Sequence, residues 1–181
     1  MQALGRELLL ALGENPDREG LRDTPRRWAA WWKEFIEYDP ANVETTFEAI
    51  TTEQMVVVSG IRIYSICEHH LIPFWCDVTI GYVVDNKVLG LSKFARIAHN
   101  SAHRLQIQER LVGEIADEVQ RICDSADVIV LASGVHLCMV MRGIKTEGTI
   151  SSLVTRGNFS TKPELRAEFL QLAKLKVSEH A

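Results

Sequence analysis

The sequence contains no run of about 18 apolar residues, the length that indicates a membrane-spanning helix, so we expect no membrane partner. Residues 1–20 lack the basic start and the small-residue cleavage site of a signal peptide, which favours a cytoplasmic protein. An excess of positive charge is also absent. The formal net charge of −4 argues against non-specific nucleic-acid binding, although local basic groups can still bind a small anion.

Internal repeats and low-complexity segments are lacking, and a chain of 181 residues suits one domain with an appendage. Hydrophobic residues make up 46% and charged residues 24%, the balance of an ordinary globular protein. A disulfide framework is disfavoured in a cytosolic chain, and histidines near two of the cysteines favour a metal site instead. The four cysteines are Cys67, Cys76, Cys123 and Cys138.

The spacing of apolar residues predicts an α+β fold with a mainly antiparallel sheet, because helices and strands follow in blocks and not in βαβ alternation. An aromatic stripe at helical spacing, Trp28, Trp31, Trp32 and Phe35, indicates a packing face. The expected helices span residues 3–38 (two helices, the second starting at Thr24 and Pro25), 92–101, 105–123 and 163–174. The expected strands span residues 54–59, 61–66, 77–83, 127–133 and 136–142, the last two with a bend at Gly134.

Residues 67–70 read Cys-Glu-His-His, and the separation of Cys67 from His70 is a common ligand spacing for zinc. A second run, His-Leu-Cys at residues 136–138, favours one site assembled by folding. If this run is a strand, His136 and Cys138 point to the same face.

The number of ligands separates two kinds of zinc site. A structural zinc takes four protein ligands, whereas a catalytic zinc takes three and leaves a position for water, whose pKa it lowers to about 7. Counting Cys67, His70 and Cys138 as ligands leaves His69 and His136, which can move protons near neutral pH.

A candidate anion site begins at Ser92, where the pattern predicts the start of a helix. Helix N-termini present free N–H groups and a positive dipole end to anions. Lys93 and Arg96 lie near one face of the first turn, and Arg142 follows Cys138 on what we expect to be the same strand face. These groups suit a phosphate chain, although the sequence has no P-loop motif.

Each pattern also has a simpler explanation, and the residues alone leave it open. The metal-binding residues could form a closed structural zinc site that includes His69 or His136, or Cys67 and Cys76 could form a disulfide. The basic residues could be solvated side chains on a capped helix. The Gln-Glu-Arg run at residues 108–110 could be an exposed helix face.

Four motifs in order resemble those of the GTP cyclohydrolase I family. They are Cys-Glu-His-His at 67–70, Gly-Leu-Ser-Lys with Ala-Arg at 90–96, Gln-Ile-Gln-Glu-Arg-Leu at 106–111, and His-Leu-Cys-Met-Val-Met-Arg-Gly at 136–143. Residues 17–25 and 166–170 resemble the ends of the family's chains, so the resemblance covers nearly the whole sequence.

The resemblance implies a T-fold, an antiparallel sheet backed by two helices. It divides the chain into an N-terminal helical appendage (residues 1–50) and a catalytic domain (residues 51–181). It also implies a homodecamer of stacked rings, with active sites between subunits and GTP as the substrate.

The resemblance assigns a role to each candidate residue. The zinc ligands would be Cys67, His70 and Cys138, and the acid and base would be His69 and His136. Glu109 would hold the guanine edge with help from Gln108, and the triphosphate would contact Ser92, Lys93, Arg96 and Arg142.

The implied reaction adds water to C8 of the purine while His136 protonates N7. The imidazole ring opens, formate leaves, and the ribose rearranges and closes to give 7,8-dihydroneopterin triphosphate, without a redox cofactor. The sequence does not specify whether a folate, biopterin or deazapurine pathway uses this product. The competing hypotheses are a nucleotide-binding relative without turnover, an NADPH-dependent nitrile reductase of the same fold, and a structural zinc protein.

The sequence departs from the family pattern at Ser133, where an acidic residue is common, at His103, which replaces arginine, and at Cys76, which replaces glycine. From the sequence, Ser133 could alter the support of His136, and Cys76 could add a thiol near the site.

Overall fold

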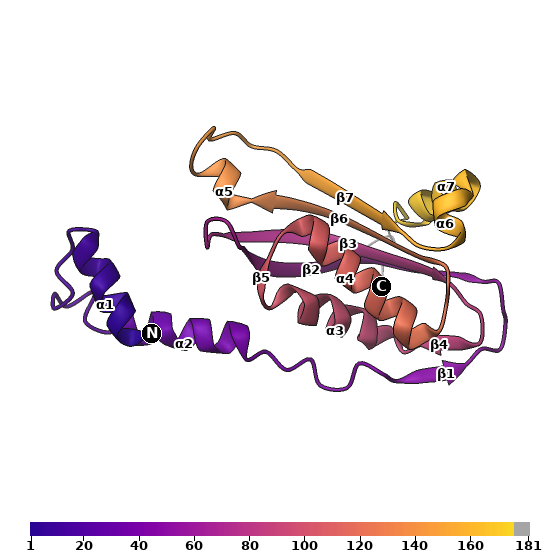
Figure 1. Ribbon diagram of the computed structural model, residues 1–181, viewed down its shortest axis with the longest axis horizontal. Helices are drawn as coiled ribbons and strands as arrows, with labels where there is room; N and C mark the ends of the chain where they lie inside the picture. The colour runs from indigo at the N-terminus through magenta and orange to yellow at the C-terminus, as the bar shows by residue number, and fades with distance from the viewer. Residues whose placement is uncertain (176–181) are drawn as a thin grey trace, which may run out of the picture. The chain divides into compact units, whose positions relative to one another are not determined.

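The computed structural model describes residues 1–175, which form two compact units: Met1–Asp39 and a second unit that begins at Pro40 (Figure 1). Strand β1 (Thr46–Glu48) pairs with β4 (Lys87–Leu89) inside the second unit. The division into an appendage of residues 1–50 and a catalytic domain of residues 51–181 stays a prediction. Among the described residues, no helix combines the length and the apolar character that crossing a bilayer requires.

The first unit is a pair of helices, α1 (Gln2–Ala11) and α2 (Thr24–Ile36), which agrees with the two helices expected from the sequence. Trp28 of the aromatic stripe packs against α1. A Cβ added at Gly5 of α1 would lie 3.1 Å from the Trp28 ring, so the two helices meet closely at this point. Trp28 and the buried Phe35 therefore pack within this unit, whereas Trp31 is 41% exposed.

The second unit is built on a five-stranded sheet with the order β5-β2-β3-β6-β7. All neighbouring strands pair antiparallel except the short β5, which runs parallel to β2. The strands are β2 (Met55–Cys67), β3 (Pro73–Val83), β5 (Leu105–Gln106), β6 (Val128–His136) and β7 (Ile150–Thr155). The predicted mainly antiparallel sheet is confirmed.

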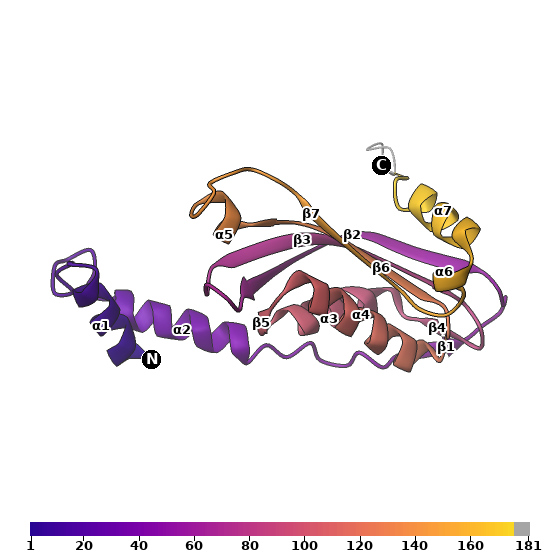
Figure 2. The same ribbon diagram turned by 45° about the horizontal axis from the view of Figure 1, so that its top comes forward.

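Two helices, α3 (Leu91–Ala102) and α4 (Gln108–Cys123), cover one face of the sheet (Figures 1 and 2). The apolar stripe of α4 recurs at helical spacing and is buried in the main core. Its residues are Leu111, Ile115, Val119 and Ile122. Helix α4 begins three residues later than the expected residue 105, because Leu105–Gln106 pair with β2 as a strand. On β3, alternate residues from Phe74 to Tyr82 fill the same core. This sheet backed by two helices is the expected T-fold.

The opposite face of the sheet has a smaller core at one end. There α6 (Asn158–Thr161) and α7 (Pro163–Leu172) pack against the strands, and Phe169 lies against Gly81 and Ile129. The metal-binding candidates lie away from this second core, at the other end of β3 and β6.

The chain around Gly134 differs from the prediction of two strands over residues 127–133 and 136–142. Strand β6 runs through Gly134 to His136, and a short helix, α5 (Leu137–Val140), follows. Gly134 is needed for close approach and not for a bend, because a Cβ there would lie 2.5 Å from the Trp75 carbonyl oxygen and 2.8 Å from Gln108 Oε1. A glycine within a strand pattern can mark either a bend or a close approach of another part of the chain.

Gly60 likewise does not separate two strands. β2 is continuous, with an irregular register between Val58 and Ile61, and Gly60 adopts a φ of 76° at this bulge. The sequence also did not predict β1, β4, β5 or β7. Strands β1, β4 and β5, of two or three residues, carry too few alternating residues to be seen in the pattern. The six residues of β7 follow a Gly- and Thr-rich stretch and were not predicted as a strand.

We expect Gly134→Ala to destabilise the fold by about 2 kcal/mol, because the added methyl group overpacks the contact between β3, β6 and α4. Thermal unfolding followed by circular dichroism would measure the loss. Gly113→Ala is the matched control: a Cβ there meets nothing within 4 Å, and a helical alanine should raise stability by about 0.5–1 kcal/mol. Equal unfolding temperatures for the two variants would contradict the crowding at Gly134.

Candidate functional site

The metal turn, defined as residues 67–70, reverses the chain at the end of β2. The N–H of Leu71 donates to the Cys67 carbonyl (2.9 Å), and the N–H of Cys67 donates to the Ile72 carbonyl (3.0 Å). Leu71 has a φ of 54°, in the left-handed region that non-glycine residues seldom adopt. The turn brings Cys67 Sγ to 3.8 Å from His70 Nδ1 and 4.0 Å from His69 Nδ1.

Cys138 completes the cluster from α5. Its Sγ atom lies 3.9 Å from Cys67 Sγ, and the ligand atoms of Cys67, His70 and Cys138 all lie within 4.8 Å of one another. The strand argument that placed His136 and Cys138 on one face was wrong, because Cys138 is helical. The three residues nevertheless lie together because α5 turns the chain towards the end of β2.

The donor set fits a metal ion. Two thiols and an imidazole nitrogen are ligands that borderline and soft metal ions prefer. All four cysteines are free, so the alternative Cys67–Cys76 disulfide is absent. Burial and the neighbouring Cys67 raise the pKa of the Cys138 thiol. A bound cation would offset both effects by stabilising the thiolates.

His136 is held in one orientation beside this cluster. Its ring stacks on Phe74, with centroids 4.4 Å apart and planes 7° apart, and its Nε2 lies 3.0 Å from Gln108 Oε1. Burial lowers the pKa of His136, and the carboxylate of Glu109 partly offsets this effect. The imidazole is therefore a neutral group with a fixed plane at the end of β6.

Gln108 determines which nitrogen of His136 carries a proton. The Gln108 amide nitrogen donates to the carbonyls of Ala132 (3.2 Å) and Ile150 (3.0 Å), which can only accept. Oε1 of Gln108 must then face His136, whose Nε2 donates to it. Gln108 is 1% exposed, so both ends of its side chain are used within this chain. Its direct contact with a substrate stays a prediction.

Two further candidates are accessible near the cluster. Glu109 is exposed in the first turn of α4, near enough to His136 for its charge to act on the imidazole. His69 is exposed on the metal turn, beside Cys67. A ligand could reach both side chains while the cysteines stay largely covered.

The structure does not bring the predicted phosphate-binding residues of α3 to this cluster. The chain just before α3 lies at the Tyr82 end of β3, where the Leu89 N–H donates to the Tyr82 hydroxyl (3.0 Å). The Phe74 end of β3, beside His136, is eight residues away along the strand, or about 27 Å. The cationic groups of Lys93 and Arg96 donate to backbone carbonyls of residues 40–42.

Arg142 is the one predicted phosphate-binding residue that lies at the metal cluster. Its guanidinium contacts His70 Nε2 at 2.5 Å. The predicted position on a strand face was wrong, because residue 142 follows α5 in a turn. Within one chain, the anion-binding candidates are therefore split between Arg142 and the start of α3.

The model of the GTP cyclohydrolase I family matches residues 1–174 of this chain. The chain belongs to the GTP cyclohydrolase I family. A GTP cyclohydrolase 1 of Hyperthermus butylicus is 45% identical over 168 residues, covering 92% of this chain and 86% of that protein. A GTP cyclohydrolase 1 of Mycolicibacterium vanbaalenii is 46% identical over 177 residues, covering 94% of this chain and 88% of that protein.

A solved structure, the apo form of archaeosine synthase QueF-Like, overlaps this GTP cyclohydrolase I family chain with a TM-score of 0.49 at 16% identity. The overlap covers 59% of this chain and 97% of that one.

Two departures from the pattern of the GTP cyclohydrolase I family have clear positions. Ser133 points away from His136, to the other face of β6, where its hydroxyl lies 3.2 Å from that of Ser151. Ser133 therefore faces away from His136, and its expected effect on the support of His136 stays a prediction. Cys76 is fully buried opposite Gly134, and burial raises its pKa to about 12, so it stays a neutral thiol.

Sequence reasoning missed Phe74, whose stacking on His136 leaves no signal in the residue pattern. Arg110 is an exposed helix residue, as one interpretation of the sequence allowed, but nothing in the sequence indicated its contact with the metal turn at Glu68. Only the pairing of distant segments reveals either role.

We expect Cys67→Ala, His70→Ala and Cys138→Ala each to lose most of the bound metal, because each removes one of three clustered ligands. Metal content per chain, measured by inductively coupled plasma mass spectrometry after dialysis, would test this. Cys76→Ala and Cys123→Ala are the controls, since both thiols are buried outside the cluster. Full metal content in a Cys138→Ala variant would contradict its assignment as a ligand.

Proposed function

We propose that this chain hydrolyses the imidazole ring of GTP, releasing formate and forming 7,8-dihydroneopterin triphosphate. Membership of the GTP cyclohydrolase I family supports this reaction. The observation that carries it is the Cys67–His70–Cys138 cluster next to a buried, oriented His136. Hydrolysis needs both an electrophilic centre and a group that moves protons beside it.

The proposed ion is Zn²⁺, held by Cys67, His70 and Cys138. Two thiolates and one imidazole make a donor set that zinc accepts in catalytic sites, with a coordination position left for water. When bound, the ion would supply Lewis acidity and make water a stronger nucleophile at neutral pH.

His136 would accept the proton that water loses as it adds to C8 and would pass this proton to N7 of the purine. Its Nε2 is engaged by Gln108, so the nitrogen available for exchange with the substrate is Nδ1. The stacking on Phe74 keeps the ring plane constant through the reaction. His69, exposed on the metal turn, would exchange protons between the reacting groups and solvent.

Glu109 would recognise the guanine edge, since a carboxylate can accept hydrogen bonds from both N1–H and the exocyclic amine. Its exposure in the first turn of α4 supports this role. Gln108 would assist by orienting His136, because its amide is already occupied within the chain.

The triphosphate would lie between subunits. Ser92, Lys93 and Arg96 at the start of α3 would bind the phosphates of a GTP whose base lies at a neighbouring chain's metal cluster, together with that cluster's Arg142. The separation of these two groups of residues in one chain supports such a shared site. We propose the homodecamer as the assembly, a closed arrangement in which every chain contributes to its neighbours' sites. The cytoplasmic location stays a prediction.

We expect zinc-loaded protein incubated with GTP to produce formate and the pterin in equal amounts. His136→Ala should lower kcat by about 100- to 10,000-fold, the contribution of a general acid–base group, while zinc content stays unchanged. Pterin fluorescence after oxidation and mass spectrometry would follow the reaction. His103→Ala is the matched control, because this histidine lies at the end of α3. Loss of zinc from His136→Ala would contradict its role as acid and base.

A shared site predicts complementation between two defective variants. Lys93→Glu and His136→Ala should each be nearly inactive, but co-assembly of the two should restore activity at about a quarter of the sites, since random mixing pairs intact halves at that frequency. Activity at limiting GTP, measured before and after subunit exchange, would test this. If the activity of the mixture only equals the summed activities of the two separate variants, Lys93 and His136 act within one chain.

A further inference from the structure

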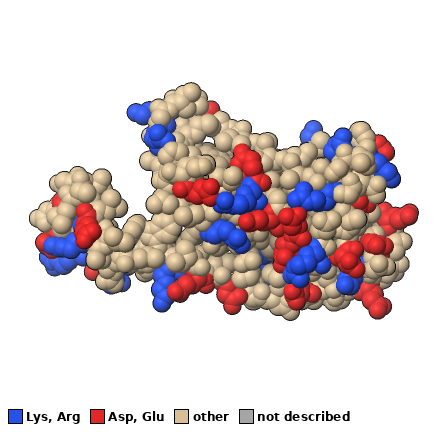
Figure 3. All heavy atoms as spheres, in the orientation of Figure 1, with Lys and Arg blue, Asp and Glu red and all other residues tan. Residues whose placement is uncertain are grey.

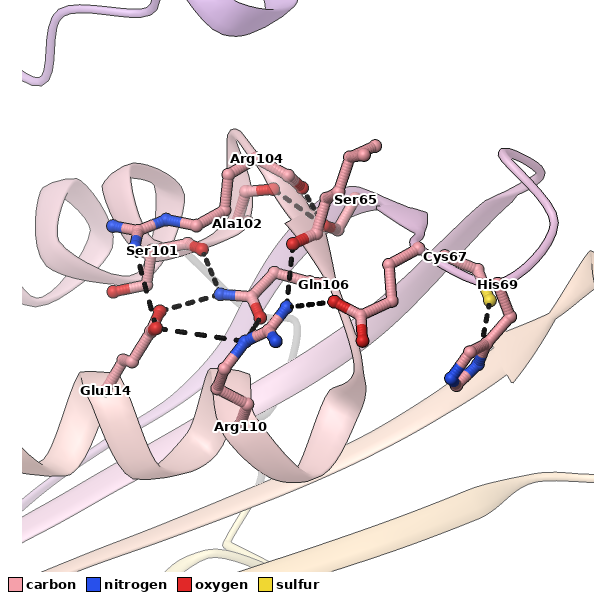
Figure 4. Close-up of polar contacts among 11 residues, drawn as sticks. Ser65, Cys67, His69, Ser101, Ala102, Arg104, Gln106, Arg110 and Glu114 are labelled. Carbon is pink, nitrogen blue, oxygen red and sulfur yellow. Dashed lines mark hydrogen bonds and ion pairs between the residues drawn. The ribbon is translucent and has the colours of Figure 1, made fainter.

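A polar network joins the metal turn to the first turn of α4 (Figure 4). At its centre, one terminal nitrogen of Arg110 donates to Glu68 (2.5 Å) and to the Leu105 carbonyl (2.8 Å). Its Nε donates to Gln106 Oε1 (2.8 Å). Arg110 therefore binds three groups at once, including the residue between Cys67 and His69.

Gln106 anchors this network from inside the protein. Its side chain is fully buried, and its amide nitrogen donates to the Ser101 carbonyl (2.9 Å) and to Glu114 (2.7 Å). The Ser101 carbonyl can only accept and Arg110 can only donate, so the amide orientation is fixed. The backbone carbonyl of Gln106 also accepts from the Glu68 N–H (3.1 Å), next to its pairing with Cys67 in the sheet.

Stability alone is a weak explanation for the Arg110–Glu68 pair. The two side chains are 40% and 33% exposed, and ion pairs of this kind contribute about 0–1 kcal/mol to folding. Acidic and basic groups are interleaved over the helical face of the second unit (Figure 3). Arg121 of α4 forms partly exposed pairs of this ordinary kind with Glu118 and Glu44. What distinguishes Glu68 is its position between a metal ligand and a candidate catalytic histidine.

The partner of Glu68 has an equally specific position. Arg110 directly follows Glu109, the exposed carboxylate proposed to hold guanine, and both belong to the first turn of α4. Contacts from Arg110 to the metal turn therefore connect the two halves of the site that must grip opposite sides of one purine ring. A change in their separation would misplace the ring relative to the ion.

We propose that Arg110 is a positioning residue: held by Gln106, it fixes the metal turn through Glu68, so that the metal ligands and Glu109 keep a constant separation. This inference rests on the metal site of the proposed function. Groups that orient metal ligands from behind commonly affect metal affinity, and here the orienting group also carries the substrate-binding turn.

The test is the zinc affinity of the full-length protein, measured by competition with a fluorescent chelator. Arg110→Ala should weaken zinc binding by about 10- to 100-fold, the usual effect of losing an outer partner of a metal site. It should also raise the KM for GTP when zinc is saturating, because Glu109 loses its fixed separation from the metal turn. Arg121→Ala, which removes surface pairs with Glu118 and Glu44 away from the cluster, should leave zinc affinity and KM unchanged.

A double-mutant cycle tests the route through Glu68. If Arg110 acts through this residue, the Arg110→Ala/Glu68→Gln double variant should bind zinc no more weakly than the worse single variant. If the losses of zinc affinity in the two single variants add up in the double variant, the proposal is overturned. Should Arg110→Ala fail to fold, Arg110→Lys serves instead: lysine keeps the charge but cannot bind Glu68, Gln106 and Leu105 together, so an intermediate loss of zinc affinity is expected.

Three other results would also be decisive. Wild-type zinc affinity and KM in the Arg110 variants would overturn the positioning role and leave the proposed function intact. An equal loss of zinc affinity in Arg121→Ala would show that the effect is general destabilisation, and it would also overturn the positioning role of Arg110. A wild-type protein that binds no zinc would overturn the proposed function itself, and the inference with it.

Discussion

The pairing of β3 with β6 is the constraint on which the site depends. It sets Phe74 opposite His136 and Cys76 opposite Gly134. A slip of one residue would turn every side chain of β6 to the other face, so this register alone gives His136 its stacking partner. Gly134 leaves space for the Gln108 amide, which then ties the start of α4 to β6 and β7. One ladder thus orients the histidine and the helix beside it.

Local patterns predicted the parts of the molecule whose geometry is itself local. The α4 stripe followed from apolar spacing because the helix packs one face on one sheet. Cys67 and His70 could be paired from sequence because both lie in a single turn. Cys138 was placed in the right cluster for a partly wrong reason, since the expected strand is a helix. Counting ligands already left His69 and His136 as spare histidines, and the family motifs then assigned them the roles of acid and base.

The missed features all depend on contacts between distant segments. Glycine at position 134 signals either a bend or a crowded strand, and only the neighbours Trp75 and Gln108 decide between them. Arg110 resembles a solvated helix residue until β5 pairs with β2 and brings Gln106 and Glu68 within its reach. The residues at the start of α3 are typical of an anion site in sequence. The sequence of a helix start, however, does not indicate which other side chains complete the site.

The cluster also joins parts of the chain that are far apart in sequence. Cys67 and Cys138 are separated by 71 positions, and their sulfur atoms lie 3.9 Å apart. An ion held by both would close a loop that contains β3, both covering helices and β6. Closing a loop removes conformations from the unfolded chain, as a disulfide does. The ion would therefore act as a reversible cross-link of the core, so that the chemistry of the site and the resistance of the sheet to unfolding would depend on the same three ligands.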